Sequence, residues 1–94
     1  MTIQWARDAT QQLLAAHAYV AADNPAAALR LVLRITQTVN HLGAHPAAGR
    51  EGRVRNTREL VIPGTPYIVA YRIRRSTVQV LAVLHGKRRW PESF

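Results

Sequence analysis

The stretch YIVAYRIRRSTVQVLAVL, Tyr67–Leu84, decides the fold of this chain. Apolar residues alternate at a period of two in Tyr67–Ile73 and again in Thr77–Leu84, which predicts two β-strands. The short connection Arg74–Ser76 joins them as an antiparallel hairpin. The second strand is apolar on both faces, so we expect it to lie at the centre of a sheet.

Strict alternation gives each strand of this hairpin two distinct faces. In the first strand Tyr67, Val69, Tyr71 and Ile73 share one face, while Ile68, Ala70 and Arg72 share the other. In the second strand Val78, Val80, Ala82 and Leu84 alternate with Gln79, Leu81 and Val83. We expect Tyr67 and Tyr71 to belong to the core.

The segment before the hairpin predicts a third strand, Thr57–Ile62. The sequence Pro63-Gly64-Thr65-Pro66 is turn chemistry that connects it to the hairpin. Upstream, Ala47–Asn56 contains two glycines and three arginines and is predicted as an exposed loop. These three strands should form an antiparallel meander.

The N-terminal half is helical in pattern. Apolar residues recur at helical spacing up to Val20, and again from Ala28 to Leu42. Asn24 is a cap and Pro25 a first helical residue for the second helix, which Gly43 ends. Thr2–Trp5 is a further short strand, with Trp5 in the core.

The sequence therefore predicts a single α+β domain over residues 1–94, with the order β-α-α-β-β-β. An N-terminal antiparallel helical hairpin packs on a small, mainly antiparallel sheet. The chain has no cysteine, secretion signal or membrane-spanning segment, so we expect a cytoplasmic protein without a membrane partner. We expect neither a metal nor a cofactor, because no ligand cluster or phosphate-binding loop is present.

Charge is concentrated in the second half. Up to Pro46, three arginines face two aspartates, whereas from Ala47 onward ten basic residues face three glutamates, a net charge of +7. Such asymmetry predicts a polyanion or an acidic protein as partner. The candidate binding residues are Arg53, Arg55, Arg58, Arg72, His85, Lys87, Arg88 and Trp90. Trp90 suits packing and binding equally, and clustered Arg beside His suits both phosphate contacts and acidic peptides.

Three blocks of the chain resemble the RelE/ParE superfamily of type II toxin–antitoxin toxins. They are YVAADNPAAALRLVLRITQTVNHLGAHPAAGR, TRELVIPGTPYIVAYRI and VQVLAVLHGKRRWP. The resemblance implies a growth-inhibiting toxin of a plasmid-stabilisation module, which forms a hetero-oligomer with a cognate acidic antitoxin. We expect this antitoxin to bind the sheet and the basic half.

The resemblance leaves two targets open. RelE-like members cut mRNA on the ribosome, whereas ParE-like members inhibit DNA gyrase by binding. Two residues of the RelE pattern are missing: its arginine is replaced by Ile68 and its terminal tyrosine by Phe94. The GKR element does match and places a RelE-type arginine on Arg88. ParE-like sequences commonly carry His at the position of His85. The ParE-like interpretation, a non-catalytic gyrase inhibitor, is favoured, and the ribosome-dependent endoribonuclease is the alternative, with His85, Arg72 and Arg88 to supply its chemistry.

Overall fold

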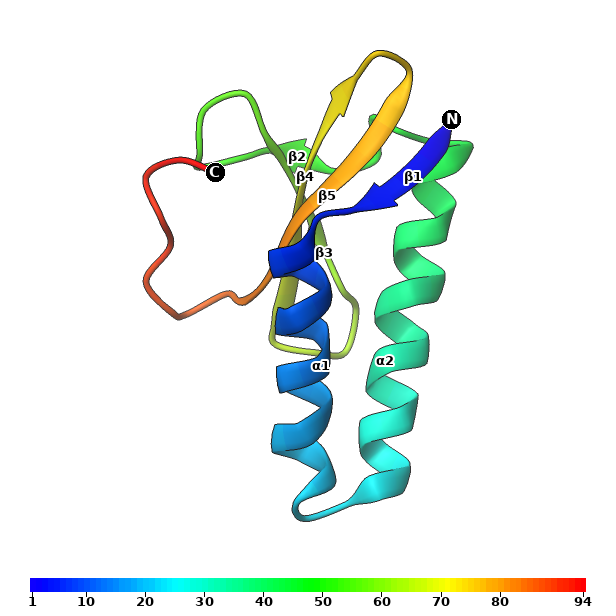
Figure 1. The fold of residues 1–94 in the computed structure, drawn as a ribbon, viewed down its shortest axis with the longest axis vertical. Coiled ribbons are helices and arrows are strands. Elements are labelled where there is room, and N and C mark those ends of the chain that lie inside the picture. Colours follow the sequence, from blue (N-terminus) through cyan, green and yellow to red (C-terminus); the bar gives the residue numbers. More distant parts are fainter.

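The computed structural model describes all 94 residues as two helices on one face of a five-stranded sheet (Figure 1). The elements in chain order are β1 (Thr2–Trp5), α1 (Arg7–Ala21), α2 (Pro25–Asn40), a 3₁₀ turn (His41–Gly43), β2 (Arg50–Glu51), β3 (Arg58–Val61), β4 (Tyr67–Arg74) and β5 (Thr77–His85). The predicted α+β fold and its helical hairpin are confirmed. The Asn24 side chain caps α2 as predicted, accepting from the Ala27 N–H at 3.0 Å.

The sheet has the order β1-β5-β4-β3-β2, with β1 parallel to β5 and all other pairs antiparallel. β5 is therefore an internal strand between β1 and β4, but β4 takes the centre of the sheet that was expected for β5. The prediction of an uninterrupted exposed loop over Ala47–Asn56 is wrong, because β2 lies within it and pairs with β3. A strand of two residues is too short to produce a period in the sequence.

A bulge interrupts the pairing of β4 with β5. Ala70 pairs with Ala82 and Tyr71 with Val80, so Leu81 has no partner. The extra residue moves Val83 into the core that Val80 shares. The predicted grouping of Val83 with Gln79 is therefore wrong, since strict alternation assumes a regular ladder.

The two faces of the sheet are covered by different parts of the chain. On the helix face, buried residues of α1, α2 and the sheet form the core: Ala9, Ile35, Val39, Ile62, Val69, Val80 and Val83. The opposite face, called the open face below, carries Ile68, Ala70 and Ala82, which are also buried. Both helices continue past the end of the sheet, where their outer ends have no strand beside them (Figure 1). Neither helix is long and apolar enough to cross a membrane.

Tyr71 joins the central strand to the segment that follows α2. Its side chain is fully buried, and its hydroxyl donates to the Pro46 carbonyl at 2.7 Å and accepts from the Gly49 N–H at 2.9 Å. Burial raises the pKa of the Tyr71 hydroxyl above its ordinary value, so it stays protonated. A Cβ on Gly49 would lie 2.6 Å from the Tyr71 ring, so only glycine fits here.

We expect Tyr71→Phe to lower the free energy of unfolding by about 1–3 kcal/mol, because it leaves the Gly49 N–H and the Pro46 carbonyl without a partner. Urea unfolding of the purified variant measures this. Tyr19→Phe is the matched control, since Tyr19 is 75% exposed. Equal stability of the two variants would contradict the role given to the Tyr71 hydroxyl.

Candidate functional site

The carboxylate of Glu59 organises the segment around β2 and β3. Glu59 pairs with Ala70 and so lies on the open face, where its side chain is only 2% exposed. It accepts hydrogen bonds from the Arg53 N–H at 2.7 Å, from the Arg53 guanidinium at 3.0 and 3.1 Å, and from Arg50 at 3.1 Å. Burial disfavours the charged carboxylate, but these hydrogen bonds outweigh it and hold the pKa of Glu59 below its usual value.

Arg53 connects this ion pair to the C-terminal tail, Gly86–Phe94. Its guanidinium carbon lies 3.8 Å from the centre of the Trp90 ring, a cation–π contact. The Trp90 Nε1 is buried and has no hydrogen-bond partner. The tail leaves β5 and turns back toward the segment between β2 and β3, which it contacts through Trp90 and Arg53 (Figure 1). Trp90 therefore packs against the protein, and Arg53 is occupied by internal contacts.

The basic residues of the tail lie on a loop that is fixed at both ends. At its start the Gly86 N–H donates to the Pro66 carbonyl at 2.8 Å, and at its far end Trp90 stacks on Arg53. The exposed residues between these anchors are Lys87, Arg88 and Arg89. The loop presents three cations to solvent.

His85 and Arg88 lie close together on the helix side. Both line a crevice of about 200 Å³ between α1 and the end of β5. The His85 ring meets Tyr67 edge to face at 5.9 Å, and its Nδ1 accepts from the Lys87 N–H at 3.2 Å.

Arg72 is remote from His85. Tyr67 pairs with His85 whereas Arg72 pairs with Gln79, so the two positions are five residues apart along β4, about 16 Å at the rise of a strand. An odd separation also places Arg72 on the open face, opposite to Tyr67. The three residues that could supply nuclease chemistry are therefore not brought together.

The remaining predicted residues have different environments. Arg58 donates to the backbone carbonyl of Gly49 at 2.8 Å and so supports the chain before β2. Arg55 is exposed in the loop between β2 and β3. Of the eight predicted site residues, the structure groups His85, Lys87 and Arg88 at one end of β5, and Arg53 with Trp90. Their part in binding a target stays a prediction.

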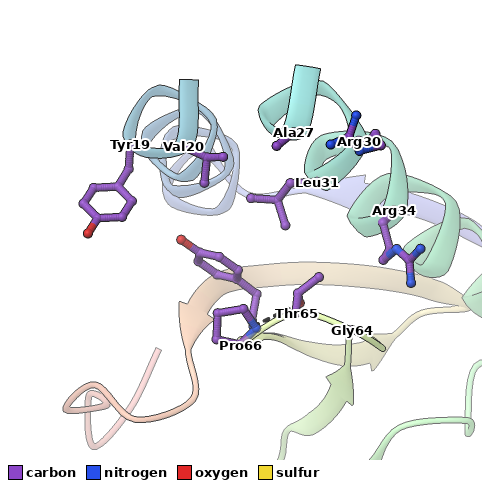
Figure 2. Close-up of a pocket in the computed structure, with 10 residues that line it drawn as sticks. Tyr19, Val20, Ala27, Arg30, Leu31, Arg34, Gly64, Thr65 and Pro66 are labelled. Atoms are coloured by element: carbon purple, nitrogen blue, oxygen red, sulfur yellow. Dashed lines mark hydrogen bonds between the residues drawn. The ribbon is translucent and has the colours of Figure 1, made fainter. Parts of the chain in front are cut away.

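A groove that the sequence did not predict lies where the helical hairpin leaves the sheet. It holds about 520 Å³ between α1, α2 and the turn from β3 to β4 (Figure 2). Tyr19, Val20 and Leu31 form its apolar part, and Arg30 and Arg34 stand along the α2 side. Arg34 also donates to the Pro63 carbonyl at 3.0 Å, which fixes the turn. Exposed large apolar residues outside the core stripe, such as Tyr19, were the signal that could have revealed it.

The fold and its sequence pattern define a RelE/ParE-superfamily toxin, and comparison with known proteins identifies the family. Residues 3–90 match the family described as "ParE toxin of type II toxin-antitoxin system, parDE". The chain belongs to this ParE toxin family. The resemblance noted in the sequence is thereby confirmed.

Individual proteins agree with this assignment. The chain is 44% identical to "Putative toxin Y4kP" of Sinorhizobium fredii, over 96% of this chain and 93% of that protein. It is 27% identical to toxin RelE2 of Caulobacter vibrioides, over 92% of this chain and 96% of that protein. A solved chain of the chromosomal ParDE toxin–antitoxin system from P. aeruginosa superposes with a TM-score of 0.83 at 27% identity, over 90% of this chain and 95% of that one.

We expect Glu59→Gln to lower the free energy of unfolding by about 1–3 kcal/mol at neutral pH, because charge-assisted hydrogen bonds to a buried group are lost. The folded-state pKa of Glu59 lies below its unfolded value of about 4.5, so this contribution is present above that pH and is lost as pH falls through the folded-state pKa. Urea unfolding at several pH values measures the difference between wild type and variant.

The exposed Glu51→Gln is the control, since Glu51 forms no ion pair. A stability difference between wild type and Glu59→Gln that stayed constant down to pH 2 would contradict the assignment.

Proposed function

We propose that this protein is a growth-inhibiting toxin of a plasmid-stabilisation module that acts in the cytoplasm by binding DNA gyrase, without catalysis of its own. The observation that carries the proposal is the dispersal of Arg72 and His85 to opposite faces of the sheet. Ile68, where the RelE pattern has an arginine, is an apolar residue that is 8% exposed, and Phe94 has no hydroxyl to transfer a proton. Loss of one transition-state contact typically costs about 10²–10³ in rate, so two absences favour binding over cleavage.

A binding inhibitor needs a complementary surface rather than a reactive constellation. The loop that carries Lys87, Arg88 and Arg89 supplies such a surface, since its side chains are exposed while both of its ends are anchored. Anchoring reduces the entropy lost on binding. We assign the contact with gyrase to this loop together with His85.

A ribosome-dependent mRNA interferase is the second candidate. One observation favours it: His85 and Arg88 share a crevice, which places a possible general acid or base near a cation. The similarity to a protein named toxin RelE2 points the same way. In this case His85 would be the leading acid–base residue.

Purified protein is expected to inhibit the supercoiling activity of gyrase and to leave mRNA on programmed ribosomes intact. Lys87→Gln/Arg88→Gln should weaken the inhibition by at least about tenfold, since two exposed cations of the contact are removed. Arg7→Gln/Arg30→Gln removes the same charge from the helices and should inhibit like wild type. Codon-phased cuts in mRNA with supercoiling untouched would overturn the proposal and favour the interferase.

We further propose that a cognate acidic antitoxin neutralises the toxin by placing an apolar and acidic segment in the groove. The groove fits such a segment because the Tyr19 and Tyr67 rings and Leu31 offer apolar contacts beside Arg30 and Arg34. From there the segment can continue along the basic C-terminal half. A disordered partner that folds on binding can wrap surfaces of this extent.

Tyr19→Asp is expected to weaken antitoxin binding by at least about tenfold, because it puts a negative charge into an apolar groove that must accept an acidic segment. Surface plasmon resonance with the cognate antitoxin measures this, and the circular dichroism spectrum and urea unfolding of the free variant serve as the control for folding. Association with wild type should slow with added salt, because opposite charges steer the encounter. Unchanged affinity of Tyr19→Asp would place the antitoxin elsewhere.

A further inference from the structure

The tip of the β4–β5 hairpin carries three arginines that have no acidic partner. They are Arg72, Arg74 and Arg75, at the end of β4 and in the turn. Both ion pairs of the protein are made by Glu59, which lies elsewhere on the sheet. Glu51 lines a hollow beside Arg72 but forms no ion pair within 4.0 Å. Neighbouring cations that form no ion pair repel one another, so an anion bound among them would relieve the repulsion.

Amide side chains complete this cluster across three strands. Gln79 lies between Arg72 on β4 and Gln4 on β1 in the pairing register, so the three share the open face. The Arg72 Nε donates to the Gln79 Oε1 at 2.6 Å, which fixes the direction of the guanidinium. A hollow of about 380 Å³ beside it is lined by polar side chains alone: Gln4, Arg74, Arg75, Thr77 and Gln79. All five can donate a hydrogen bond to an oxyanion.

The hairpin turn holds its residues in an unfavourable backbone conformation. Arg75 and Ser76 have φ values of 53° and 58°, the left-handed region in which two-residue turns favour Asn-Gly. Strained residues of this kind are held in place by the surrounding structure and cluster at functional sites. Arg75 thus stands in the turn at the tip of the hairpin, and this tip lies away from the C-terminal tail (Figure 1).

The hairpin tip is also accessible from the side. β3 ends its pairing with β4 at Tyr71, so Arg72–Arg74 has no strand on that flank. The tip is therefore the end of a three-stranded segment, β1-β5-β4, in which β4 has an open edge and Arg74 and Arg75 are exposed.

We propose that the hairpin tip, Arg72–Thr77 with Gln4 and Gln79, is a binding site for the phosphodiester backbone of a nucleic acid. Guanidinium groups bind phosphate in a bidentate manner, and the amides add neutral donors beside them. The site is separate from the groove and from the tail loop. The proposal does not depend on which macromolecule the toxin inhibits.

Fluorescence anisotropy with a labelled 12-base-pair DNA duplex and a labelled 12-nucleotide single-stranded RNA tests the site and distinguishes the two sources of phosphate. Wild type should bind at least one of them, with an affinity that falls steeply with salt. In Arg74→Gln/Arg75→Gln the slope of log affinity against log salt should become shallower by about 1.8 for the duplex, or by about 1.4 for the single strand, which is about 0.9 or 0.7 for each lost phosphate contact. Affinity at low salt should fall more than tenfold.

Two further variants isolate the site from net charge and from the strain of the turn. Arg30→Gln/Arg34→Gln removes the same number of charges, but from α2. Its fold loss of affinity should be at least three times smaller than that of the hairpin variant. Ser76→Gly should raise the thermal unfolding midpoint and keep wild-type affinity, because it relieves the turn and retains all three arginines. Equal loss in the two double variants would overturn the proposal in favour of diffuse charge, and so would absence of binding by wild type to both probes.

Discussion

The pairing of β4 with β5 is the constraint on which the rest of the structure depends. Ala70, Tyr71, Val80 and Ala82 are almost fully buried at the middle of this pair, so both of its faces have to be shielded from water. The helical hairpin shields one face, where the core lies. Both helices lie on that face, and the contacts over the other face are made by irregular segments.

The contacts of Glu59 hold these irregular segments over the open face. Its carboxylate forms ion pairs with Arg50 and Arg53 over the open face. Arg53 in turn stacks on Trp90 and so holds the tail in place. An acidic residue in a very basic half thus serves as the internal counter-charge. Two arginines are used in this role and Arg58 supports the chain before β2, whereas Arg55, Arg74, Arg75, Arg88 and Arg89 are exposed to solvent. The clustering of charge in the sequence therefore combines a structural function with a binding function, which composition cannot separate.

The sequence predicts the elements of this fold well and their finer geometry poorly. Periodicity and turn chemistry locate both helices and the strands β1, β3, β4 and β5, because each is long enough to repeat its pattern or has a distinct boundary. The bulge at Leu81 escapes prediction, since it depends on the register between two strands and not on either strand alone. For the same reason the distance between Arg72 and His85 could not be predicted from the sequence, because it follows from the pairing register of β4 and β5. The contacts of Glu59 are likewise non-local, and the groove arises from three elements that are distant in the sequence.

The dispersal of cations over separate surfaces has a consequence for how such a toxin can be controlled. A nuclease concentrates its charged groups at one reacting phosphate, so an inhibitor has to reach that point. Here the tail loop, the groove and the hairpin tip lie on different parts of the molecule, and no single small contact covers all of them. A partner that neutralises this protein must either be extended enough to reach several surfaces or bind one of them and block the target by its bulk. An acidic segment that starts in the groove satisfies the first condition, since the opening of the groove and the crevice of His85 share Tyr19 and Tyr67. The shared tyrosines connect the site proposed for the antitoxin with the residues proposed to contact gyrase, so occupation of one restricts access to the other.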